Sequence, residues 1–200
     1  MSGERRLELG DVLNFFEYEK VRASMRARVI ALKRVRRVSV GAHLSFVFEN
    51  RDTVLFQVQE MCRVERITDD GRIQAELDVY NGLLPQRGEL SATLMIEIED
   101  QAQIKPILDR FVGIDVGPHV FIQVGKEYAV PGVFEAGHSD EEKGKLSAVH
   151  FVRFAFPPEA VRAFASADVF LVVDHPAERA RTPLSAETRA ALLEDLAPRT

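Results

Sequence analysis

The sequence predicts an α+β fold, with several helices packed against a largely antiparallel sheet, in a single domain over residues 1–200. The first half reads as helix-rich and the second half as strand-rich. The strands are joined by loops or short helices, without the regular crossovers of a doubly wound parallel sheet, which is the alternative. With 46% hydrophobic residues in 200 positions, the chain can bury a core without disulfides or metal staples.

The helical period dominates the first half. Asp11 is placed to cap a short helix over 12–16, and a longer helix is predicted from 17 to 37. Apolar residues recur there at spacings of four, four and three, namely at Val21, Met25, Val29 and Leu32. Two more helices, over 55–65 and 73–84, are separated by Asp69, Asp70 and Gly71 and are predicted to form an antiparallel hairpin.

Alternating apolar and polar residues predict the strands. The clearest runs from Glu89 to Glu99, where Leu90 and every second residue to Ile98 point one way. Further strands are predicted over 44–49, 119–124, 128–135, 148–156 and 168–174. Shorter helices are predicted over 101–111, after the proline pair at 157–158, and after Ser185, which is placed to cap the last one.

Charge and cysteine content exclude several classes of protein. The net charge of −5 argues against nucleic-acid binding by the whole surface. Cys62 is the one cysteine, so neither an internal disulfide nor a self-contained iron–sulfur cluster can form. No apolar run has the length of a signal peptide or a membrane helix. We therefore expect a cytoplasmic protein that does not act at a membrane.

Metal and catalytic motifs are missing from the sequence. The five histidines lie more than five residues apart, and the Gly-x-Ser-x-Gly pattern of serine hydrolases is absent. We therefore predict no metal and no cofactor, and we interpret Cys62 as a core residue. The polar stretch 137–144 is interpreted either as an ordinary surface loop or as a lid over a site.

A basic run in the long predicted helix is the sharpest charge feature. Four of its side chains fall within about 60° of each other on a helix and define a predicted basic ridge: Arg22, Arg26, Lys33 and Arg37. One interpretation is a site for an acidic partner or an anionic ligand. The other is a solvated face that pairs with the protein's own carboxylates.

A second candidate site lies where a strand is predicted to lead into a helix. Free N–H groups at a helix N-terminus favour anions, and Arg51 would add a bidentate grip. The candidate ligand-binding residues are Asn50, Arg51, Asp52, Gln57 and Glu60. The alternative is a plain helix cap made by Asn50 or Asp52, with Arg51 in a structural ion pair.

Three runs of the sequence resemble an uncharacterised bacterial family, catalogued as domain of unknown function 3501. They are FENRDTVLFQVQEM (48–61), YNGLLPQRGELSATL (80–94) and KLSAVHFVRF (145–154). The resemblance implies a one-domain family with no established activity. It also implies genes often found beside a rubrerythrin-like protein and a heterodisulfide-reductase-like iron–sulfur protein, and hence a role in redox or peroxide metabolism.

Two functional hypotheses follow. The first is a non-enzymatic accessory or binding protein whose partner is the rubrerythrin-like or the iron–sulfur protein. The second is an enzyme that acts on a small anionic substrate, with Arg51, Glu60 and either His150 or Lys145 meeting in a pocket. The sequence decides neither between these two nor whether the chain forms a homo-oligomer.

Overall fold

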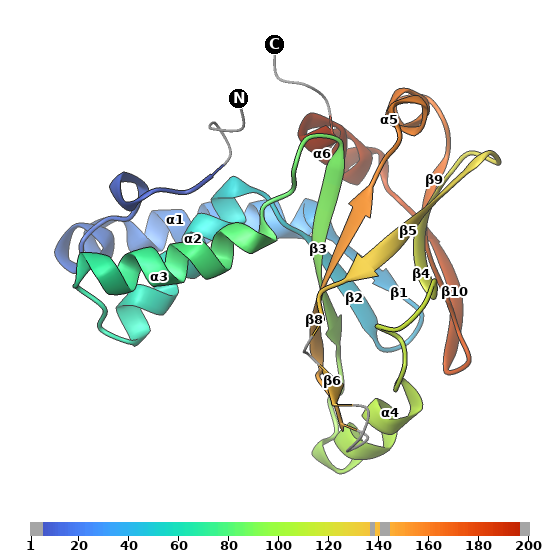
Figure 1. The fold of residues 1–200 in the computed structure, drawn as a ribbon, viewed down its shortest axis with the longest axis horizontal. Helices are drawn as coiled ribbons and strands as arrows, with labels where there is room; N and C mark the ends of the chain where they lie inside the picture. Colours follow the sequence, from blue (N-terminus) through green and yellow to red (C-terminus); the bar gives the residue numbers. More distant parts are fainter. Residues whose placement is uncertain (1–5, 137–138, 141–144, 197–200) are drawn as a thin grey trace.

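The computed structural model describes residues 6–136, 139–140 and 145–196. A strongly curved sheet forms one side of the molecule, and a layer of long helices projects from it on the other (Figure 1). Helix and antiparallel sheet are thus combined, as predicted. Within the described residues, no helix has both the length and the apolar character needed to cross a membrane.

The main sheet has eight strands in the order β1-β2-β3-β8-β5-β4-β9-β10, and every neighbouring pair is antiparallel. The strands are β1 (Arg37–Val40), β2 (Leu44–Phe48), β3 (Glu89–Ile96), β4 (Val120–Val124), β5 (Tyr128–Phe134), β8 (Val149–Ala155), β9 (Val169–His175) and β10 (Glu178–Pro183). A separate short pair joins β6 (Ser139–Asp140) to β7 (Lys145–Leu146).

Side chains bring the two ends of the sheet together, so the sheet curls into a nearly closed barrel. The Thr182 hydroxyl on β10 donates to the Ser39 carbonyl on β1 over 2.9 Å. The Ala42 amide donates to the Glu178 carboxylate over 3.2 Å. Gly41 turns the chain with φ +68, and a Cβ there would collide with that same carboxylate. The contact between β1 and β10, which nearly closes the barrel, therefore depends on Gly41 and on polar side chains as well as on pairing within the sheet.

The inside of the barrel is the larger hydrophobic core. Leu90, Ala92, Leu94 and Ile96 of β3 all point into it, in the predicted phase. Three helices cover the open ends of the barrel: α4 (Ile104–Arg110), which follows the turn η3 (Gln101–Gln103), then α5 (Pro158–Phe164) and α6 (Ala186–Leu196). Figure 1 shows α4 at one end and α5 and α6 at the other.

A second, smaller core holds together the helical arm, which we define as α1 (Phe15–Arg36), α2 (Arg51–Val64) and α3 (Asp70–Tyr80). The arm also includes the turns η1 (Leu9–Asp11) and η2 (Asn81–Leu83). Val54, Val58 and Cys62 of α2 are buried there beside Leu77 of α3. Buried Val47 on the outer side of β2 lies where α1 crosses the barrel.

The structure corrects several details of the predicted elements. The expected division into a helix-rich and a strand-rich half is not confirmed, because β1, β2 and β3 come from the first hundred residues and α5 and α6 from the second. The long helix ends at Arg36, so Arg37 begins β1. Strands β1 and β10 were not predicted. They are short strands at the two ends of the sheet, and every second side chain in each is exposed.

Candidate functional site: the helical arm

Glu60 of α2 lies at the centre of a polar cluster between α1 and α2. Its Oε1 accepts hydrogen bonds from the Tyr18 hydroxyl (2.6 Å) and from Nε of Arg22 (2.7 Å), and its Oε2 accepts one from Arg22 Nη2 (2.9 Å). The bond from Arg22, together with that from Tyr18, lowers the pKa of Glu60 to about 2. Burial, together with the Glu60 carboxylate, raises the pKa of Tyr18. Near neutral pH Glu60 is therefore ionised, while Tyr18 and Arg22 keep the protons that they donate to it.

The strand-to-helix junction is occupied by the protein's own groups. The Asn50 side chain accepts from the Thr53 amide, and the Thr53 hydroxyl accepts from the Asn50 amide, which makes a capping box. Arg51 pairs with Asp11, and Asp52 pairs with Arg28 at 2.7 Å. Burial alone would raise the pKa of Asp11, but bonds from the Glu8 amide and from Arg51 hold it below its usual value. The geometry is that of a structural cap, and a ligand role for these residues stays a prediction.

Gln57 donates a hydrogen bond to the buried carboxylate of Glu49, which directly precedes the junction. Glu49 is 2% exposed and carries no cation beside it in the described residues. It accepts from the Thr53 hydroxyl at 2.5 Å, the Thr93 hydroxyl at 2.7 Å and Gln57 Nε2 at 3.1 Å. These three neutral donors compensate for lost hydration and bind α2 to β3. The sequence signal was an acid at the end of an apolar strand.

The residues expected to share an enzyme pocket are not brought together. Arg51 and Glu60 are nine positions apart on α2, which places them on about opposite sides of the helix. His150 is fully buried in β8, where its Nε2 lies 2.7 Å from the Ser147 carbonyl and its Nδ1 lies 3.6 Å from Asp115. The side chain of Lys145 and most of the stretch 137–144 lie outside the described residues.

The structure divides the predicted basic ridge. Arg22 is bound to Glu60, and Arg37 lies on β1, where it pairs with Glu97. Arg26 is exposed and Lys33 half-buried, both on α1. Arg28 of the same helix is 70% exposed, whereas Arg36 at its end is buried. Binding of a partner by these residues stays a prediction.

A face of α1 that points away from the arm carries exposed apolar side chains. Phe16 is 78% exposed and Ile30 is 56% exposed. Six exposed residues fall within about 80° on the helix, and we call them the outer stripe: Phe16, Lys20, Ala23, Ala27, Ile30 and Arg34. Buried Tyr18 and Val29 lie on the opposite face. The helix therefore has two apolar faces, of which the described chain covers one.

The spacing of apolar residues in the sequence could have predicted the outer stripe, although the predicted helix was given only one apolar face. Phe16, Ala23, Ala27 and Ile30 are spaced by seven, four and three, which is a helical period in its own right. The predicted inner stripe is correct at Val29, which is buried, and Met25 and Leu32 are half-buried, but Val21 is 37% exposed. The true inner face includes Tyr18 and Arg22, whose polar tips bind Glu60 while their stems pack.

The remaining reactive group of the arm is the thiol of Cys62, which is buried in α2. Burial raises the pKa of the Cys62 thiol, so the nucleophilic thiolate is disfavoured. Within the described ranges, no group of three or more histidine, cysteine, aspartate or glutamate side chains is arranged to hold a metal ion.

Comparison with known proteins finds relatives without an assigned function. The profile of a family described as "Protein of unknown function (DUF3501)" matches residues 6–196. A crystal structure of a novel protein of unknown function from Burkholderia pseudomallei K96243 matches with a TM-score of 0.88 and 36% sequence identity. That match covers 98% of this chain and 100% of the other. No curated protein matches the chain significantly.

Proposed function

The chain belongs to the DUF3501 family, and we propose that it is a non-enzymatic accessory protein of the bacterial cytoplasm that binds a redox partner through the outer stripe of α1. The partner is a protein with an acidic face: the rubrerythrin-like or the iron–sulfur protein that the family resemblance implies. The observation that carries the proposal is the outer stripe itself, on a helix whose other face is already packed.

The apolar part of the outer stripe supplies the reason to bind. Phe16 and Ile30 leave most of their surface in water, and each would contribute about 1.5–3 kcal/mol if fully buried. Ala23 and Ala27 between them are small, so a partner helix can approach the α1 backbone closely. An amphipathic helix laid along such a stripe is a common form of protein recognition.

The charge of α1 indicates which partner fits. The helix has seven basic and two acidic residues. Arg22, Arg28 and Arg36 have carboxylate partners within the protein. In the described part of the chain, four others form no ion pair, namely Lys20, Arg26, Lys33 and Arg34. These cations would repel a second copy of the same helix and attract an acidic surface.

The groups named for catalysis support the binding hypothesis over the enzyme hypothesis. Glu60 has a pKa of about 2 and is held by Tyr18 and Arg22, so it is a poor general acid or base near neutral pH. Arg51 is paired with Asp11 on the other side of α2. The enzyme hypothesis stays a prediction, and among the described residues Arg51, Glu60 and His150 do not converge on one pocket.

Calorimetric titration with each purified candidate partner tests the proposal. We expect one of the two to bind the native chain at low salt. The double variant Phe16→Ser/Ile30→Ser should weaken that binding by at least about tenfold. The matched control is Val133→Ser, which removes an apolar side chain of 65% exposure from β5 of the barrel. It should bind as the native chain does.

The outcomes separate the proposal from its alternatives. Circular dichroism and melting temperature establish that the variants fold. If folded Phe16→Ser/Ile30→Ser binds as tightly as the native chain, the outer stripe is not the interface. If neither candidate partner binds the native chain at any salt concentration, the proposed redox association is wrong.

A further inference from the structure

The N-terminal segment from Leu7 to Asn14 lies across α2 and α3 and is held at both ends by side-chain amides. Asn81 accepts from the Leu7 amide at 2.7 Å and donates to the Leu7 carbonyl at 2.9 Å. Gln59 does the same at Leu13, at 2.6 Å and 3.0 Å. These two pairs of hydrogen bonds fix the position of the segment over the helices.

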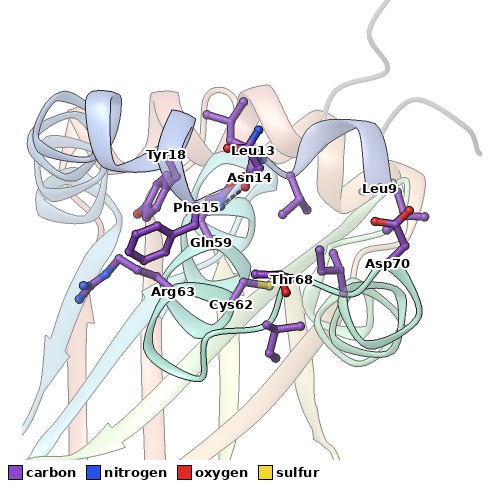
Figure 2. Close-up of a pocket in the computed structure, with 13 residues that line it drawn as sticks. Leu9, Leu13, Asn14, Phe15, Tyr18, Gln59, Cys62, Arg63, Thr68 and Asp70 are labelled. Atoms are coloured by element: carbon purple, nitrogen blue, oxygen red, sulfur yellow. Dashed lines mark hydrogen bonds between the residues drawn. The ribbon is translucent and has the colours of Figure 1, made fainter.

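A cavity of about 140 Å³ lies beneath this segment. Leu9, Val12 and Leu13 line it from the segment, while Cys62, Ile67 and Ile73 line it from α2, α3 and the loop between them. Figure 2 shows the Cys62 sulfur near the middle of the lining and the bond from Gln59 to Leu13 above it. The size is about that of the engineered cavity that takes up benzene.

The polar groups of the lining are already used within the protein, and this decides the chemistry of the ligand. Both ends of the Gln59 amide are bound to Leu13, and the Tyr18 hydroxyl is bound to Glu60. Asn14 caps α1. The one cation of the lining, Arg63, is paired with Glu19 at 3.6 Å and with Glu60 at 3.5 Å, and Thr68 and Asp70 are exposed at the edge. A ligand inside would therefore meet mainly carbon surface and one thiol, and the cation at its side already has two carboxylate partners.

We propose that this cavity is a binding site for a small neutral apolar molecule, of the size of one aromatic ring or a short branched hydrocarbon group. It lies on the side of the arm where α2 and α3 meet the N-terminal segment. The inference does not depend on the partner bound by the outer stripe. An apolar ligand of this size would replace empty volume with van der Waals contacts at no cost in unpaired polar groups.

Benzene is the probe, with benzoate as its charged counterpart. We expect benzene to raise the melting temperature in a saturable manner and to shift the NMR signals of the Leu9 and Ile73 methyl groups. It should also slow alkylation of Cys62. Benzoate should do none of these, because its carboxylate would lose its hydration while Arg63, the cation of the lining, is already paired with Glu19 and Glu60.

A filled-cavity variant locates the site. Ile73→Phe adds a ring to α3 at the cavity and should reduce benzene affinity at least about tenfold. Val79→Phe adds the same ring to the same helix, at a residue of 71% exposure that does not line the cavity, and should bind benzene normally. If Ile73→Phe fails to fold, Cys62→Met fills the same space.

Three results would overturn the inference. One is the absence of any saturable effect of benzene on the native chain. Another is equal benzene affinity in the filled and native proteins. The third is binding of benzoate as tight as that of benzene, which would show a charged site in place of an apolar one.

Discussion

Arg36 Nη1, near the C-terminal end of α1, lies 2.7 Å from Asp195 Oδ2 on α6, and the Arg36 side chain is only 3% exposed. Arg36 Nη2 also donates to the Ala191 carbonyl at 3.3 Å. The two residues are 159 positions apart in the sequence. Their bond fastens the helical arm to the helix that covers one end of the barrel.

Removal of this bond should be costly. We expect Arg36→Leu to lower the free energy of unfolding by about 3–5 kcal/mol, because it breaks a largely buried ion pair between α1 and α6. Arg28→Leu is the matched control on the same helix, since its pair with Asp52 is largely exposed and should contribute about 0–1 kcal/mol. Urea unfolding measures both. If both variants lose similar unfolding free energy, the Arg36–Asp195 ion pair stabilises the fold no more than an exposed pair does.

A charge change inside the barrel at the end of β3 should cost much more stability than one at the next, exposed position. Ile96→Asp places a carboxylate inside the barrel, where Ile96 is 5% exposed, and should cost several kcal/mol, on the order of the whole stability margin. Glu97→Lys changes the next side chain, which is half exposed and bonded to Ser45 and Arg37, and should cost about 1 kcal/mol. Thermal melts compare them, and equal losses would mean that the strand is assigned to the wrong phase.

Stability should fall in mild acid because of His175 on β9. Burial lowers the pKa of His175, and the neighbouring His119 lowers it further. Nδ1 of His175 accepts from the Ala177 amide at 3.2 Å, which requires that nitrogen to carry no proton. The unfolded chain therefore binds a proton at a higher pH than the folded chain, so stability is full above about pH 6.5 and declines as the pH falls below it.

Unfolding free energies between about pH 7 and about pH 5 test this effect. His175→Asn keeps an acceptor for the Ala177 amide but does not titrate, so its pH dependence should be shallower than that of the native chain. The other charged groups nearby, His119, Arg110 and Asp174, are unchanged in the variant. If the unfolding free energies of the two proteins change with pH in parallel, groups other than His175 cause the acid sensitivity.

The unpaired cations of α1 should set the salt dependence of partner binding. Arg26→Gln/Lys33→Gln should leave the unfolding free energy within about 1 kcal/mol of the native value, because neither side chain forms an ion pair in the described residues. It should weaken partner binding at low salt, where the Debye length is about 10 Å or more, and matter little at 1 M, where it is about 3 Å. A large loss of stability would show an internal ion-pair network instead.

Sequence periodicity predicted most of the fold because most elements have one apolar face and local caps. Ser185, for example, caps α6 as expected, with its hydroxyl 3.0 Å from the Thr188 amide. β10 was missed because its sequence, ERARTP, has no apolar alternation. It forms a strand because its six residues pair in register with β9. The sequence of β10 alone does not show this pairing.

The site was harder to predict because its chemistry depends on partners distant in the sequence. Glu60 looked like a free carboxylate on a helix face, yet Tyr18 and Arg22, about forty positions earlier, neutralise it. Arg51 looked available for an anion, yet Asp11 already holds it. A sequence shows which groups can ionise, whereas only tertiary structure shows which are already paired.

Hydrogen exchange of the chain alone and in the presence of the binding partner tests the central claim most directly. The account predicts that exchange slows in α1, over the turns that hold Phe16, Ala23 and Ile30, and stays unchanged in the exposed β5 region around Val133. Slowed exchange confined to the barrel strands, with α1 unchanged, would contradict the claim that the outer stripe is where this protein binds.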